Sequence, residues 1–100
     1  MALRFTPEAF NDLNDLDAYL SDKSPQGLRN VLAALKKTFQ LIEGNALLGR
    51  PTSRESVRVA IEPGYKYVIP YYDDGTDIWV LRVYHSRRAP LDYLALDIPL

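Results

Sequence analysis

Apolar residues recur at helical spacing through the first half of the chain. A short apolar run from Leu3 to Phe5 predicts a strand, and the residues after it are typical of a helix start. Thr6 supplies a capping hydroxyl, Pro7 suits the first turn, and Glu8 favours the positive end of the helix. The apolar positions of this first predicted helix are spaced by three and four: Ala9, Phe10, Leu13, Leu16 and Leu20.

A second helix is predicted directly after the first. Ser24 and Pro25 repeat the capping pattern, and Gly44 tolerates the backbone of a helix end, so we expect this helix to stop near Glu43. Its apolar stripe lasts about four turns and is the clearest periodicity in the chain: Leu28, Val31, Leu32, Leu35, Phe39 and Ile42. Because the connection is so short, the two helices should form an antiparallel hairpin.

Beyond a polar segment at residues 49–56, the spacing changes to period two, which is typical of strands. Turn residues at 62–64 and 73–76 divide this part, so we expect antiparallel strands at Val57–Ile61, Tyr65–Tyr72 and Asp77–His85. Pro70 has no N–H to donate, which predicts a bulge or an unpaired position there.

The last predicted strand has two apolar faces. One face, which we expect to pack on the helices, holds Trp79, Leu81 and Val83. The opposite face holds Ile78, Val80, Arg82 and Tyr84.

Composition bounds the fold and the chemistry. With 100 residues, 47% of them hydrophobic and 25% charged, the chain fits one domain over residues 1–100. The predicted class is α+β: a short N-terminal strand and a helical hairpin packed on a small antiparallel sheet. Without cysteine, disulfides, thiolate metal sites and a cysteine nucleophile are excluded, and the single His85 disfavours a histidine metal site.

We expect no cofactor, no metal and no small-molecule substrate. The first residues lack the apolar region of a signal peptide, and no apolar run is long enough to span a bilayer. The expected location is therefore the cytoplasm, with no membrane partner.

Charge gathers in the second half of the chain. The formal net charge is −1, so bulk positive charge does not point to nucleic-acid binding. Residues 50–91 nevertheless carry seven basic and five acidic side chains, and a histidine and two arginines follow the last strand in the segment IWVLRVYHSRRAP. Arg87 and Arg88 should be exposed there and bind a partner, because a solvated cationic end needs no internal partner. His85 is suited to proton transfer, or to a structural or partner contact.

Arg82 has two interpretations. Its side chain pairs internally with a carboxylate such as Asp77 or Glu62, or it contacts a partner's carboxylates or a phosphate. Six aromatic residues allow base stacking but are more typical of sheet packing, with Tyr84 the one expected to stay exposed: Tyr65, Tyr67, Tyr71, Tyr72, Trp79 and Tyr84.

Two other features have simple physical interpretations. The paired acids Asp73 and Asp74 precede a glycine and are explained by hydrogen bonds within a turn. In the apolar C-terminal segment, Leu94, Leu96 and Ile98 either cover a sheet edge or form a target-binding element.

Three segments together resemble the RelE/ParE superfamily of bacterial toxins from type II toxin–antitoxin systems. They are FTPEAFNDLNDLDAYL, then Gly49-Arg50-Pro51 followed by Arg58, and then GYKYVIPYYDDGTDIWVLRVYHSRRAP. The resemblance implies a growth-inhibiting toxin neutralised by a cognate antitoxin that lays a helix or an extended segment over its surface. It further implies that ParE-like members bind DNA gyrase, whereas RelE-like members cleave messenger RNA in the ribosomal A site.

The chain looks closer to the ParE-like branch. Metal-free RNA cleavage needs several converging cations and an acid or base, and this sheet offers few. We therefore expect a non-catalytic gyrase inhibitor whose antitoxin- or target-binding residues are Arg82, Tyr84, His85, Arg87 and Arg88. The antitoxin should be acidic or apolar where it meets Arg82, Tyr84 and the C-terminal segment.

Two alternatives stay open. One is a ribosome-dependent, metal-independent endoribonuclease that would use the basic residues of the sheet, Arg58, Lys66 and Arg82, together with Arg87 and Tyr93, whose spacing resembles the arginine-to-tyrosine pair of RelE-like enzymes. The other is a degenerate member that has lost toxicity and only binds the antitoxin.

Overall fold

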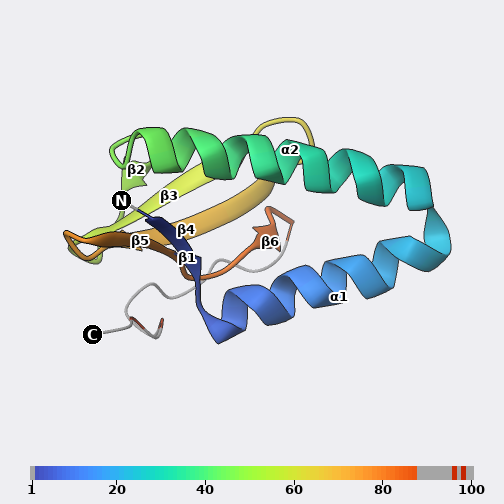
Figure 1. The fold of residues 1–100 in the computed structure, drawn as a ribbon, viewed down its shortest axis with the longest axis horizontal. Helices are drawn as coiled ribbons and strands as arrows, with labels where there is room; N and C mark the ends of the chain where they lie inside the picture. The colour runs from blue at the N-terminus through green and yellow to red at the C-terminus, as the bar shows by residue number, and fades with distance from the viewer. Residues whose placement is uncertain (1, 88–95, 97, 99–100) are drawn as a thin grey trace.

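A strand, a helical hairpin and five further strands follow one another along the chain (Figure 1). The computed structural model describes residues 2–87, 96 and 98. The elements are β1 (Ala2–Phe5), α1 (Pro7–Lys23), α2 (Pro25–Gly44), β2 (Arg50–Pro51), β3 (Val57–Glu62), β4 (Tyr67–Asp73), β5 (Asp77–Val80) and β6 (Tyr84–His85). This is the predicted α+β fold, with β2 as a short strand inside the segment expected to be a loop.

Both helices begin at the predicted caps. The Thr6 hydroxyl accepts a hydrogen bond from the Ala9 N–H at 3.2 Å, and the Ser24 hydroxyl accepts one from the Gly27 N–H at 3.0 Å. Ser24 is the only residue between the helices, so α1 and α2 lie side by side as an antiparallel pair (Figure 1). The predicted hairpin is thus confirmed.

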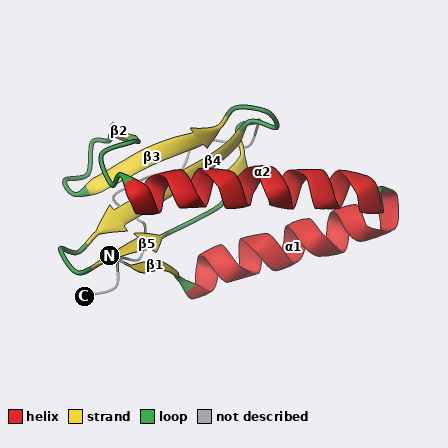
Figure 2. Cartoon of the chain, turned by 45° about the horizontal axis from the view of Figure 1, so that its top comes forward, coloured by secondary structure: helices red, strands yellow, loops and turns green. Residues whose placement is uncertain are grey.

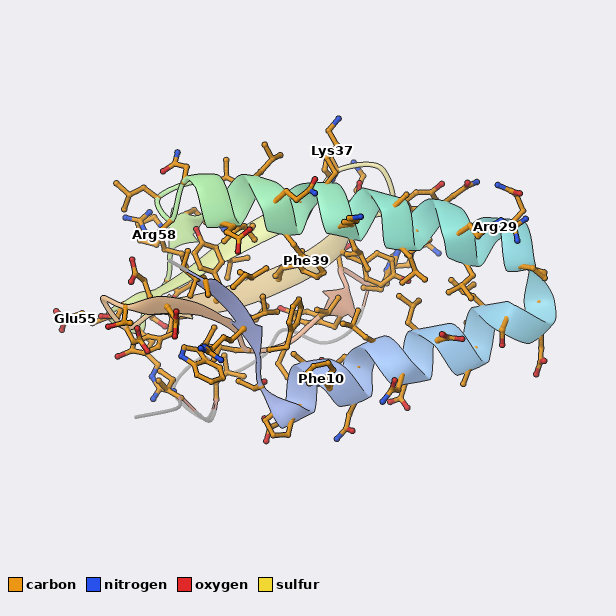
Figure 3. All side chains as sticks on the ribbon, in the orientation of Figure 1. Phe10, Arg29, Lys37, Phe39, Glu55 and Arg58 are labelled. Atoms are coloured by element: carbon orange, nitrogen blue, oxygen red, sulfur yellow. The ribbon has the colours of Figure 1, made fainter. Side chains whose placement is uncertain are left out.

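The two helices relate differently to the sheet. Figure 2 shows α2 lying lengthwise over the strands, whereas α1 begins after the end of β1 and lies beside α2. Figure 3 shows Phe10 and Phe39 on the inner sides of the hairpin, while Lys37 points outward from α2. Phe5 contacts both aromatic rings, with centroid separations of 5.7 Å to Phe10 and 5.0 Å to Phe39, and so joins β1 to the hairpin.

The sheet has the strand order β1-β5-β4-β3-β2, and β6 also pairs with β4. Neighbouring strands are antiparallel except β1 and β5, which are parallel, with Ala2 opposite Asp77 and Phe5 opposite Val80. The sheet is therefore mixed rather than purely antiparallel, because the N-terminal strand enters at its edge beside β5.

The strand predicted over Asp77–His85 is broken in two by a bulge. Tyr71 lies opposite Val80 and Val68 lies opposite Tyr84, so residues 81–83 face only residues 69 and 70. Pro70 has no N–H to donate, and its carbonyl accepts a bond from the Leu81 N–H at 2.9 Å. The irregularity predicted at Pro70 is confirmed, and the extra residue lies on the facing strand.

The bulge also corrects the predicted faces of the last strand. Ile78 and Val80, both 0% exposed, pack in the core with Leu35 and Ile42 of α2, whereas Trp79 is half-buried. Val83 joins the same core because the extra residue shifts the alternation by one position. The expectation that Trp79, Leu81 and Val83 share the helix-facing side is therefore wrong.

Candidate protein-binding site

A carboxylate on α1 reaches the bulge and pairs with Arg82. The Asp12 Oδ2 atom lies 2.7 Å from Arg82 Nε and its Oδ1 atom lies 3.0 Å from Arg82 Nη2. The Val83 N–H donates to the same carboxylate at 2.9 Å. Hydrogen bonding to Asp12 raises the pKa of the Arg82 guanidinium above its ordinary value. Arg82 thus has an internal partner, but that partner is Asp12 rather than the predicted Asp77 or Glu62.

The partners named for Arg82 have other roles. Asp77 accepts a hydrogen bond from Arg4 Nε at 2.7 Å and so joins β5 to β1. Glu62 is buried at the end of β3 and accepts from the N–H groups of Gly64 and Tyr65 at 2.7 and 2.6 Å. Each carboxylate stabilises a local element of the sheet.

A groove of about 530 Å³ lies between α1 and β6. Its α1 wall consists of Asp12, Asp15, Leu16 and Tyr19, and its sheet wall consists of Tyr67, Val83, Tyr84 and His85. We call this surface the α1–β6 groove. Tyr19 is 61% exposed, which is high for a large aromatic residue, while Tyr84 is only 7% exposed and packs with Val59 and Val68. The prediction that Tyr84 is exposed is therefore wrong, because its ring belongs to a second apolar cluster.

His85 lies at the mouth of this groove. Its ring contacts Tyr67 edge-on at a centroid distance of 5.4 Å, and its Nδ1 atom accepts a hydrogen bond from the Arg87 N–H at 3.1 Å. Nδ1 is therefore an acceptor, which leaves Nε2 to carry the proton of a neutral ring. Among the described residues, no titratable side chain hydrogen-bonds to the ring.

Lys66 and Arg87 lie at the same end of the sheet as His85. Lys66 has a φ of 64° in the turn between β3 and β4, and its carbonyl accepts a bond from the Ser86 N–H at 2.9 Å. Both basic side chains are exposed, as predicted for Arg87. We call the two exposed cations Lys66 and Arg87, together with the adjacent His85, the cationic rim. Arg88 and Tyr93 lie outside the described residues.

Arg58 lies toward the other end of β3. It pairs with Tyr71, whereas Glu62 pairs with Tyr67, so Arg58 and the cationic rim are separated by roughly 13 Å of strand. The Arg58 Nη1 atom donates to the Gly49 carbonyl at 2.7 Å, near the C-terminal end of α2 (Figure 3). The structure therefore does not bring Arg58 together with Lys66 and Arg87.

A buried tyrosine holds the segment beside Arg58. The Tyr71 hydroxyl accepts from the Gly49 N–H at 2.8 Å and donates to the Ala46 carbonyl at 2.8 Å. A Cβ atom on Gly49 would lie 2.8 Å from both the Tyr71 ring and the Val59 backbone, so only glycine fits this close approach. Tyr71 thereby attaches the segment after α2 to the sheet.

The turn between β4 and β5 confirms the interpretation of the paired acids. Asp73 accepts from the Gly75 N–H at 2.8 Å, and Asp74 Oδ1 accepts from Thr76 and Asp77 N–H groups at 2.8 and 2.6 Å. Hydrogen bonds from these backbone groups, Asp77 first, lower the pKa of Asp74. The two acids shape a turn rather than a metal site.

The described residues of the C-terminal segment lie near β3 and β4. The Leu96 carbonyl accepts from Arg54 Nη1 at 2.6 Å, and Ile98 lines a small pocket with Tyr72 and residues 54–56. Leu94 lies outside the described residues. Leu96 and Ile98 thus lie close to residues 54–56, just before the start of β3, although they are distant from these residues in the sequence.

Sequence reasoning missed the α1 wall of the groove. Asp12, Asp15, Leu16 and Tyr19 recur at three- and four-residue spacing, so they share one helix face. This mixture of acids and large apolar residues was a detectable signal. The partner of Asp12 was not detectable, because Arg82 is 70 positions away in the chain.

A helical hairpin packed on a mixed sheet, with charged residues at the end of the last strand, is the architecture of the RelE/ParE superfamily. A family model described as the ParE toxin of the type II toxin–antitoxin system parDE matches residues 3–90. The chain therefore belongs to the ParE toxin family of type II toxin–antitoxin systems.

A solved structure has the same fold. A chain from the structure titled "Chromosomal ParDE TA system from P. aeruginosa" is 23% identical and superposes with a TM-score of 0.71. The match covers 85% of this chain and 95% of that chain. A search of curated proteins found no match.

Within the described part of the chain, neither a membrane-spanning helix nor a cluster of metal-ligating side chains is present. Neither helix at residues 7–23 or 25–44 is long and apolar enough to cross a membrane. Among residues 2–87, 96 and 98, the acidic and histidine side chains do not gather in threes around a common point where a metal ion would fit.

Proposed function

We propose that this chain is a toxin that is neutralised by a cognate antitoxin and inhibits growth by binding DNA gyrase, not by cutting RNA. Membership of the ParE toxin family supports the antitoxin part of the proposal. Gyrase is a cytoplasmic target, so the proposed site of action is the cytoplasm. The observation that carries the choice of target is the separation of the cations that RNA cleavage would require.

RNA cleavage needs those cations around one phosphate. Arg82 is held by Asp12, and Arg58 donates to Gly49 roughly 13 Å of strand away from the cationic rim. Among the described residues, Lys66 and Arg87 are the exposed cations that remain at one end of the sheet. Two exposed cations suit a binding surface better than a ribonuclease site, which needs several cations and an acid or base around one phosphate.

The proposed gyrase-binding residues are therefore those of the cationic rim, with Arg87 foremost. Arginine is enriched among residues that dominate binding energy, and the Arg87 side chain has no ion-pair partner among the described residues. Arg88 follows it directly in the chain and extends the same proposal. Arg82 and Tyr84 contribute indirectly, by fixing the strand from which the rim projects.

A supercoiling assay with purified gyrase and relaxed plasmid tests the proposal. Wild-type toxin should cause cleaved DNA complexes to accumulate, and Arg87→Glu should raise the toxin concentration required by about tenfold. Lys37→Glu is the matched control, because Lys37 is exposed on the outer side of α2 (Figure 3) and should leave the effect unchanged. Gyrase activity that stays normal at excess toxin would overturn the proposal.

A translation reaction programmed with a defined message separates the alternatives. Intact message together with inhibited gyrase is the expected result. Message cut in the ribosomal A site with normal gyrase would instead establish the endoribonuclease. Cells that keep growing when the toxin is induced without antitoxin would identify a degenerate antitoxin-binding module.

A further inference from the structure

Among the described residues, no strand pairs with the edge of β6 that faces α1. β4 lies on the other side of β6, and β1, which lies beside β5, ends at Phe5 before it reaches β6. The Val83 N–H points away from β4 and is satisfied by the side chain of Asp12 at 2.9 Å. Where a neighbouring strand would lie, the Asp12 carboxylate satisfies the N–H of Val83, and beyond this contact the α1–β6 groove begins.

His85 presents the next free backbone groups along this edge. The Ser86 N–H donates to the Lys66 carbonyl at 2.9 Å, on the β4 side. Because the backbone groups of successive residues alternate in direction, His85 directs its N–H and C=O outward, as Val83 does. No described residue bonds to either group of His85. An extended segment can satisfy both, whereas a helix cannot, because its backbone groups bond to each other.

The groove beside this edge is lined by apolar and aromatic side chains from both walls and by acidic side chains from α1. Leu16 and Tyr19 face Val83 and Tyr84 across it. Asp15 is exposed on the same wall and makes no ion pair with any described residue, while the charge of Asp12 is already matched by Arg82. Across α1 as a whole, five acidic residues stand against one lysine. A segment that enters here therefore needs apolar and basic side chains.

We propose that an extended, cationic segment of the antitoxin adds a strand beside β6 in the α1–β6 groove. It pairs with the backbone of His85, buries an apolar side chain against Leu16 and Tyr19, and places a lysine or arginine near Asp15. This inference rests on the proposed neutralisation by an antitoxin. The sequence-based expectation was a partner that is acidic or apolar near Arg82; the inference keeps the apolar contact and replaces the acidic one, because Asp12 already pairs with that arginine.

A charge reversal on α1 tests the proposed segment. The chain is co-expressed with the product of the neighbouring open reading frame, and the affinity of the purified proteins is measured by calorimetry at low and high salt. Asp15→Lys should weaken binding by about three- to tenfold, with a smaller effect at high salt. Asp22→Lys is the matched control, since Asp22 is equally exposed on α1 but does not line the groove, and should bind like wild type.

Two further measurements address the apolar contact and the added strand. Tyr19→Ala should weaken binding by at least about tenfold, whereas Leu47→Ala, a control at a side chain 70% exposed outside the groove, should not. Hydrogen exchange of the His85 amide should slow in the complex, as it does when an N–H enters a strand pair.

The outcomes separate this inference from the proposed function. A complex that forms with wild-type affinity in Asp15→Lys and Tyr19→Ala, and leaves the His85 amide unprotected, overturns the inference while the antitoxin partnership stands. If hydrogen exchange of the His85 amide slows but Asp15→Lys does not weaken binding, the added strand stands and the proposal that the segment is cationic is overturned. If the neighbouring product does not bind the chain at all, both proposals fall.

Discussion

The two helices of this protein are attached to the sheet by different physical means. α2 buries Val31, Leu35, Thr38 and Ile42, whereas α1 buries only Ala9. α2 is held by apolar packing across the sheet, while α1 is joined to the bulge by the Asp12–Arg82 ion pair. The difference indicates that α2 contributes more fully buried packing to the fold, whereas the leucines of α1 that pack against the core, Leu13, Leu16 and Leu20, are only partly buried.

The largest expected effect follows from removing packing beneath α2. Leu35→Ala creates a cavity at a side chain 1% exposed, so the free energy of unfolding should fall by about 3 kcal/mol. Leu16→Ala on α1 is the matched change, and because Leu16 is only partly buried it should cost less than half as much. Urea unfolding measures both. Equal losses would contradict the contrast between the helices.

The next largest effect should come from the ion pair that holds α1. Asp12→Asn removes the charge facing Arg82, and the free energy of unfolding should fall by about 2 kcal/mol because the pair is mostly buried. Asp15→Asn, on the same wall without an ion pair, should change stability by less than about 0.5 kcal/mol. A double mutant of Asp12→Asn with Arg82→Gln should lose less than the sum of the single losses. Additive losses would show that the two groups do not interact.

A smaller effect is expected at the hydrogen bonds beyond the end of α2. Tyr71→Phe leaves the Gly49 N–H and the Ala46 carbonyl without their shared partner, and should lower the free energy of unfolding by about 1 kcal/mol. Tyr72→Phe, a neighbouring tyrosine whose hydroxyl has no partner among the described residues, is the control and should be neutral. If both variants unfold like wild type, packing alone holds this segment.

The smallest expected effect is a pH dependence of stability that distinguishes the hydrogen bonds of Tyr71 from the Asp12–Arg82 ion pair. Burial raises the pKa of Tyr71 above the ordinary value of 10.0, so the folded state holds this proton more tightly than the unfolded chain does. The contribution of Tyr71 to stability should therefore be constant below pH 10 and fall as the pH rises beyond it. The Asp12–Arg82 pair should persist there, because Asp12 raises the pKa of Arg82. The stability difference between wild type and Tyr71→Phe should thus shrink above pH 10, and a constant difference would contradict it.

The sequence alone determined the local elements, because their causes are local. Thr6 and Ser24 cap the helices as predicted, and the turn acids Asp73 and Asp74 bond to their own neighbours in the chain. The missing N–H of Pro70 likewise predicted the irregular pairing of β4. The order of these elements was also enough to indicate the toxin family.

Only the tertiary structure decided which charges are available and which faces are buried. Whether Arg82 is free depends on Asp12, a carboxylate 70 positions away that no local pattern marks as its partner. The burial of Ile78 in place of Trp79 depends on where α2 lies on the sheet, and the return of Val83 to the core depends on one extra residue in the bulge. Periodicity reveals that a strand has two faces, but the partner that covers each face is set by contacts between distant segments.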